Sequence, residues 1–92
     1  MDEVKALETD LYEYTHIFLR HNNLDTALHI AKYRLKLYPH SHYAMRTLAD
    51  VFHAQNNQTS ALLYINKAIK LAKKENHENL DNYLEKHKKF SL

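Results

Sequence analysis

The sequence predicts an all-α fold built from helix hairpins, on the basis of two observations. The first is internal repetition: when the 92-residue chain is compared with itself at an offset of 34 residues, seven positions within one 34-residue window are identical, where ordinary amino-acid usage gives about two. The second is composition, with no glycine, one proline and 45% hydrophobic residues that recur every three or four positions. Stacked helical repeats form extended surfaces rather than enclosed catalytic pockets, so we expect a binding module.

The identical positions fall in both halves of the repeating unit. They are Phe18 and Phe52, Asn22-Asn23 and Asn56-Asn57, Ala27-Leu28 and Ala61-Leu62, and Lys36-Leu37 and Lys70-Leu71. The first repeat therefore covers about 8–41 and the second about 42–75, within one domain that spans 1–92.

Two helices are expected in the first repeat. The first runs over about 2–21, with Asp2 as N-cap at the positive end of the helix dipole. Asn22 and Asn23 end this helix, because Asn tolerates the left-handed conformation in a chain without glycine. The second helix runs over about 24–38 and stops at Pro39, which disfavours helical geometry in the preceding residue. The apolar residues of the first helix, spaced by three and four, are Val4, Leu7, Leu11, Tyr14, Phe18 and Leu19.

The second repeat has the same plan, followed by a terminal segment. Ser41 is the expected N-cap of a third helix over about 42–55, and a fourth helix covers about 58–75. Its boundary at Asn76-His77 is the least marked, because no glycine or proline stands there. The segment over about 78–90 has one apolar stripe and matches the repeat poorly, as expected of a helix that caps one end of a stack.

With this period established, the chain resembles the tetratricopeptide (TPR) repeat family. The TPR signature has a large apolar, a small and an aromatic residue in the first helix, then Ala in the second helix and a closing Pro. The corresponding residues are Leu11, Tyr14, Thr15, Phe18, Ala27, Ala31 and Pro39 in the first repeat, and Met45, Leu48, Ala49, Phe52, Ala61, Ile65 and Ala68 in the second. The chain departs from the signature at its Trp (Leu11, Met45), its Gly (Thr15, Ala49) and its second Pro (Lys73).

The resemblance implies a right-handed α-solenoid of two TPR-like repeats and a C-terminal capping helix. In this family the first helix of each pair lines a concave groove that binds peptides or partner proteins. Some members clamp an acidic C-terminal peptide there with Lys and Asn. The equivalent pairs here are Tyr12 with His16 and Arg46 with Asp50, and neither is Lys with Asn, so we do not expect that mode of recognition.

The candidate partner-binding residues lie on these first helices. They are Tyr12, His16, Tyr43, Arg46, Asp50 and His53. Tyr and Arg are enriched at binding hot spots, although tyrosines in a chain with seven of them also pack against neighbouring helices. If the two histidines are exposed, an acidic ligand should bind more tightly below their usual pKa of about 6.5.

No residue pattern indicates catalysis, a metal or a cofactor. The eight histidines are scattered and we expect them on the surface. His40 and His42 flank Ser41, but two ligands fall short of the four that structural zinc requires. The chain has no Cys, no Gly-rich phosphate loop and no serine in a nucleophile elbow. We therefore expect a protein that is not an enzyme.

The charges are divided along the chain, acidic at the start and rich in lysine in the last third. An acidic partner or nucleic acid could be drawn to the lysines. The net charge is only +2, however, and lysines near helix C-termini commonly complement the helix dipole. We expect a protein or peptide partner and no nucleic acid. Uncovered ends and opposite charges also favour a homodimer.

The sequence therefore favours an adaptor that binds a protein or peptide on its concave surface. The alternative is a TPR-like appendage of a larger enzyme or regulator, which mediates docking or dimerisation. Neither a signal-peptide h-region nor an apolar run of about 18 residues is visible, so we expect a cytoplasmic protein without a membrane span. An excised piece of a longer chain would lack such signals in the same way.

Overall fold

The computed structural model describes the backbone of residues 2–92 and the side chains of residues 7–92. Five helices follow one another in this part of the chain: α1 (Asp2–Arg20), α2 (Leu24–Leu37), α3 (His42–Ala54), α4 (Gln58–Glu75) and α5 (Leu80–Phe90). The expected all-α class is confirmed, and each helix begins and ends within two residues of its expected bounds. The expected cap at Asp2 lies outside the described side chains.

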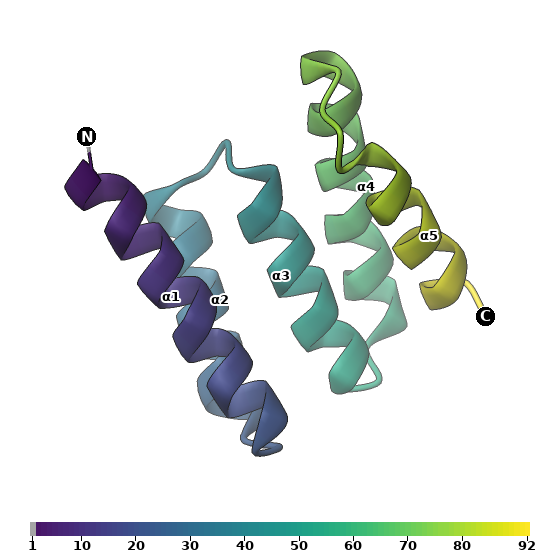
Figure 1. Cartoon of the computed structure of the whole chain (residues 1–92). Coiled ribbons are helices and arrows are strands. Elements are labelled where there is room, and N and C mark those ends of the chain that lie inside the picture. The colour runs from purple at the N-terminus through teal and green to yellow at the C-terminus, as the bar shows by residue number, and fades with distance from the viewer. Residues whose placement is uncertain (1) are drawn as a thin grey trace.

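Successive helices run antiparallel and pack side by side (Figure 1). Each helix contacts the next along the chain, and α1 also contacts α3. The helices form two layers, with α1, α3 and α5 on the viewer's side of Figure 1 and α2 and α4 behind them. The domain measures 33 × 31 × 18 Å, a slab about as thick as two layers of helices.

Asparagine ends three of the helices. Asn22, Asn56 and Asn76 have φ angles of 58°, 61° and 53°, the left-handed conformation that Asn adopts more readily than other non-glycine residues. Asn76 thus closes α4 at the boundary that was least marked in the sequence. At the start of α3, Ser41 is the N-cap as expected, and its Oγ accepts a hydrogen bond from the backbone N–H of Ala44 (3.2 Å).

Alanines allow the helices of each pair to approach closely. Ala27 and Ala31 of α2 and Ala61 of α4 are completely buried. The core extends from these alanines through α3 to Tyr83 and Phe90 of α5, so α5 covers the far end of the core, as expected of a cap.

The apolar stripe expected on α1 is buried only in part. Leu11 is buried, whereas Leu7 and Tyr14 are exposed, because α1 packs against α2 and α3 and its other side faces solvent in this structure. Leu84 of α5 is also exposed, so the apolar stripe expected over about 78–90 is buried only in part. None of the described helices is long and apolar enough to cross a membrane.

Candidate functional site: a pocket between α1 and α3

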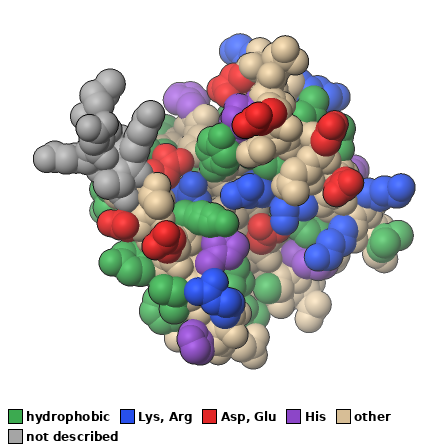
Figure 2. Space-filling model, in the orientation of Figure 1, with side chains coloured by type: hydrophobic (Ala, Val, Ile, Leu, Met, Phe, Trp, Pro, Cys, Tyr) green, Lys and Arg blue, Asp and Glu red, His purple; other side chains and the backbone are tan. Residues whose placement is uncertain are grey.

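A pocket of about 750 Å³ opens on the face formed by α1 and α3. We call it the α1–α3 pocket. Its walls come from α1 and α3, from the end of α2, from the α2–α3 connection and from the end of α4. They include Tyr12, Arg34, Ser41, Tyr43, Arg46 and Glu75. Figure 2 shows the same face, with Lys and Arg side chains running across its middle and acidic side chains on both sides.

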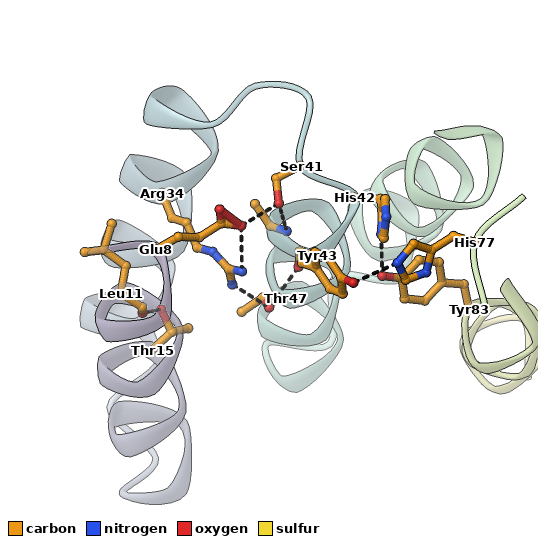
Figure 3. A network of polar contacts seen from close by, with 11 residues as sticks. Glu8, Leu11, Thr15, Arg34, Ser41, His42, Tyr43, Thr47, His77 and Tyr83 are labelled. Atoms are coloured by element: carbon orange, nitrogen blue, oxygen red, sulfur yellow. Dashed lines mark hydrogen bonds and ion pairs between the residues drawn. The ribbon is translucent and has the colours of Figure 1, made fainter. Parts of the chain in front are cut away.

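A buried arginine fixes one wall of the pocket (Figure 3). Arg34 is only 3% exposed. Its Nη2 lies 3.3 Å from Oε1 of Glu8 and its Nη1 donates to Oγ1 of Thr47 at 3.1 Å. Ser41 Oγ donates to the same Glu8 oxygen at 2.7 Å. Burial lowers the pKa of Arg34 from its usual value and Glu8 opposes this effect, so the guanidinium depends on Glu8 for its charge compensation.

A second arginine, Arg46, lies among tyrosine rings. Its guanidinium is 5.8 Å from the ring centre of Tyr12 and 5.9 Å from the ring centres of Tyr43 and Tyr83, within the range of cation–π attraction. No Asp or Glu among the described side chains forms an ion pair with Arg46. The half-buried guanidinium is thus held in place by rings and retains its hydrogen-bonding capacity.

The hydrogen bonds of His77 determine whether the Tyr43 hydroxyl can donate a hydrogen bond to a ligand. The backbone N–H of Asn79 donates to Nδ1 of His77 at 3.0 Å, so Nδ1 carries no proton. The proton of the neutral ring is therefore on Nε2, which donates it to the Tyr43 hydroxyl at 2.8 Å. Because the Tyr43 oxygen acts as an acceptor there, its own O–H remains available to an acceptor in the α1–α3 pocket.

His42 forms a second contact between α3 and the C-terminal helices. Its Nδ1 is 2.7 Å from the Tyr83 hydroxyl and its Nε2 is 3.4 Å from Oε2 of Glu75. Since an ionised carboxylate only accepts, Nε2 carries the proton and Tyr83 donates to Nδ1. Burial lowers the pKa of His42, with a further contribution from His77, and burial raises the pKa of Tyr83. Glu75 opposes the lowering of the His42 pKa, and the net effect is that His42 is protonated only in a more acidic solution than an exposed histidine.

The expectation that all histidines lie on the surface was wrong for His42, which is 3% exposed. An imidazole with one nitrogen hydrogen-bonded and the other beside a carboxylate can lie in a core, and its Tyr83 partner lies 41 residues along the chain. Local sequence patterns cannot predict a contact between residues so far apart in the chain.

The α1–α3 pocket continues along α1 into a smaller hollow of about 410 Å³, lined by Tyr12, His16, Ile17 and Arg20 among others. His16 stacks on Tyr12, with their ring centres 4.4 Å apart. Burial lowers the pKa of His16, the carboxylate of Asp50 opposes this, and nearby Arg46 adds to the lowering. Protonation of His16 therefore requires a more acidic solution than protonation of an exposed histidine.

The structure brings four of the six candidate residues together. Tyr12, Tyr43 and Arg46 line the α1–α3 pocket, and His16 lines the adjoining hollow. Neither Asp50 nor His53 lines either hollow.

Asp50 and His53 instead connect α3 to neighbouring helices. Asp50 accepts a hydrogen bond from Lys86 of α5 at 2.9 Å. Nδ1 of His53 lies 2.9 Å from Oε1 of Gln58, and its ring stacks on Phe90 with 4.6 Å between ring centres. Both side chains thus hold α5 or the start of α4 in place.

Sequence reasoning missed Arg34, Glu8 and His77. One signal was present for Arg34, which follows Ala27 and Ala31 at the spacing of a buried helix face. A charged residue at such a position requires a partner, but Glu8 is 26 residues away and no local pattern identifies it. His77 was visible only as part of a weak helix boundary.

In residues 7–92, no three His, Asp or Glu side chains converge as the ligands of a metal ion would. Comparison of the chain with models of known protein families and with curated proteins found no match.

Proposed function

We propose that this chain is a protein-interaction module that binds a peptide or a partner protein in the α1–α3 pocket and carries out no catalysis. The observation that carries the proposal is Arg46: a half-buried cation held against three tyrosine rings, with no acidic partner among the described residues. Arg and Tyr hold much of the energy of typical protein interfaces.

The site supports this function because its binding groups are already positioned. The guanidinium of Arg46 is fixed by the rings, and the hydroxyl of Tyr43 is fixed by His77. Ordering such side chains before binding reduces the entropy that the complex loses. Both groups donate hydrogen bonds, so they suit an acceptor on the ligand, such as a carboxylate or a main-chain carbonyl, while the ring of Tyr12 offers apolar surface beside them.

We also propose that the five helices form a TPR-like solenoid. The 34-residue period, the left-handed Asn22 and Asn56 at equivalent positions of the two repeats, and the sequential antiparallel packing support two TPR-like repeats in a right-handed solenoid, with α5 as the cap. In such a solenoid α1 and α3 form the concave side, the side on which the pocket opens. The TPR resemblance thus supports the same ligand-binding face.

The proposal is tested by selecting peptides that bind the chain and then removing the side chains of Tyr12, Tyr43 and Arg46. Peptides selected from a random library on the intact chain should bind it measurably by isothermal titration calorimetry. Replacement of Tyr12, Tyr43 and Arg46 together by Ala should weaken that binding at least about a hundredfold, since anchors of this kind each contribute about 2 kcal/mol or more.

The matched control is the triple variant Leu63→Ala, Lys70→Ala and Lys74→Ala, which removes three exposed side chains from α4 and should bind the peptides as the wild type does. Far-UV circular dichroism should show that both variants retain their helices. If the pocket variant binds with unchanged affinity, or only the α4 variant is affected, the ligand site lies elsewhere and the proposal is wrong.

A further inference from the structure

Exposed apolar side chains gather at one end of the domain. Of the eight large hydrophobic side chains that are exposed in residues 7–92, five belong to the first two helices. We call these five the end face: Leu7, Tyr14 and Ile17 of α1, with Tyr33 and Leu37 of α2. Surface clusters of this kind mark interaction sites more often than single exposed residues do.

In the second repeat the corresponding side of the first helix is covered, whereas Lys67 and Leu71, which correspond to Tyr33 and Leu37, are exposed and half-buried. Tyr14 corresponds to Leu48 at the 34-residue offset, and Ile17 corresponds to Val51. Tyr14 is 52% exposed but Leu48 only 1%, and Ile17 is 38% exposed but Val51 is completely buried. The difference arises because α2 packs against α3, whereas the described chain places no helix against the same side of α1. The α1 part of the end face therefore has the apolar side chains of a surface that a helix covers.

We propose that the end face binds the end face of a second copy of this chain around a two-fold axis. The exposed apolar residues are unevenly distributed between the ends: α5 and the residues after it expose only Leu84 and Leu92. A head-to-tail contact would therefore leave much of the end face without an apolar partner and would build an open array. Two identical end faces, in contrast, cover each other and close the assembly.

The charges beside the end face are self-complementary. The described part of α1 is acidic, with Asp10 exposed between Leu7 and Tyr14, whereas α2 carries the exposed Lys36 between Tyr33 and Leu37. A two-fold axis that places α1 of one copy against α2 of the other brings Asp10 near Lys36 twice. Opposite charges at the rim of an apolar contact orient the partners and exclude the arrangement in which like helices meet.

This inference is independent of the proposed ligand site. Tyr12 lines the α1–α3 pocket, and Tyr14, two positions further along, points about 200° away around the axis of α1. A dimer of this kind covers Ile17, which also lines the smaller hollow beside the pocket, but leaves the α1–α3 pocket itself open on each copy. Loss of the dimer and loss of peptide binding would be separate results.

The experiment is analytical ultracentrifugation of the intact chain at low salt, over low to high micromolar concentration. The wild type should approach twice the monomer mass of 11.0 kDa. Tyr14→Glu places a charge in the centre of the apolar contact and should raise the dissociation constant at least about tenfold. Leu63→Glu, which adds the same charge at an exposed leucine of α4, should leave the dimer unchanged.

A charge exchange tests the orientation. Asp10→Lys and Lys36→Asp should each weaken the dimer, and the double variant should restore it, because each copy then presents the reversed pair. Circular dichroism confirms that every variant is folded. A monomer at all concentrations, a dimer unaffected by Tyr14→Glu, or a dimer that is weakened by Leu84→Glu instead would each overturn the proposal.

Discussion

At the scale of single residues, Arg34 and His42, two of the four buried polar residues among the described side chains, are tolerated because each has a distant partner. Arg34 is compensated by Glu8, and His42 by Tyr83 and Glu75. One donor is left over: Nε of Arg34 is buried without a hydrogen-bond acceptor in the described part of the chain. A buried group of this kind lowers the net stabilisation from the ion pair, so the pair should serve to position the pocket wall more than to stabilise the fold.

The consequences of removing Glu8 and of removing Arg34 should therefore differ. Glu8→Ala leaves the buried guanidinium unpaired and should cost about 2–4 kcal/mol of unfolding free energy. Arg34→Met removes the charge, keeps the apolar stem, and should change stability by only about 1 kcal/mol. Urea denaturation measures both. Glu85→Ala, at an exposed position on α5, should change stability by less than about 0.5 kcal/mol. Equal losses for Glu8→Ala and Arg34→Met would contradict this account of the pair.

The lowered pKa of His42 makes stability depend on pH. Its folded-state pKa lies below the unfolded value of about 6.5, so below that pH the unfolded chain binds the proton more readily. Stability should be constant above about pH 6.5 and should decrease as the pH falls toward the folded-state pKa. The groups that face the ring are Glu75 of α4, Tyr83 of α5, His77 between them and Arg46 of α3.

Urea denaturation at several pH values measures this effect. His42→Gln, which does not titrate, should lose less stability than the wild type between neutral and mildly acidic pH. His16, whose pKa is also lowered by burial, contributes a loss of the same sign in both proteins. Identical pH profiles for the wild type and His42→Gln would rule out His42 as a source of the acid sensitivity.

At the scale of the helices, the distance between two packed helices depends on the small side chain of alanine. Ala61 of α4 is completely buried where this helix packs against α3. Ala61→Leu should therefore overpack the interface and cost about 1–3 kcal/mol, with a lower thermal midpoint. Ala54→Leu makes the same chemical change at an exposed position at the end of α3 and should leave the midpoint nearly unchanged. An unaltered midpoint for Ala61→Leu would show that the close approach lies at another position.

At the scale of the whole molecule, α5 completes a core that the four preceding helices leave open. Tyr83 and Phe90 are buried in that core, and α5 is also held by Lys86 to Asp50 and by Gln58, whose Nε2 donates to the carbonyl of Phe90. The two ends of the domain thus differ: α5 covers one, and the exposed end face forms the other.

Truncation after Asn79 should accordingly unfold the domain or leave it without a cooperative thermal transition, since the core loses both aromatic side chains at once. Leu84→Ala, at an exposed position of the same helix, is the matched control and should unfold near the wild-type midpoint. Calorimetry distinguishes the outcomes. A truncated chain with a sharp transition at the wild-type temperature would show that α5 is not required for the fold.

The sequence by itself determined the all-α class, the five helices and their boundaries, because periodicity, Asn turns and the Ser41 cap act over a few residues. It also placed Tyr12, Tyr43 and Arg46 on one side of the stack, and the structure finds all three in the lining of the α1–α3 pocket. Only the tertiary structure decided which charges are buried and what each candidate residue contacts. Glu8 with Arg34, His42 with Tyr83, and Asp50 with Lys86 are separated by 26, 41 and 36 residues. These side chains meet only after the helices have packed, so no local sequence pattern predicts their contacts.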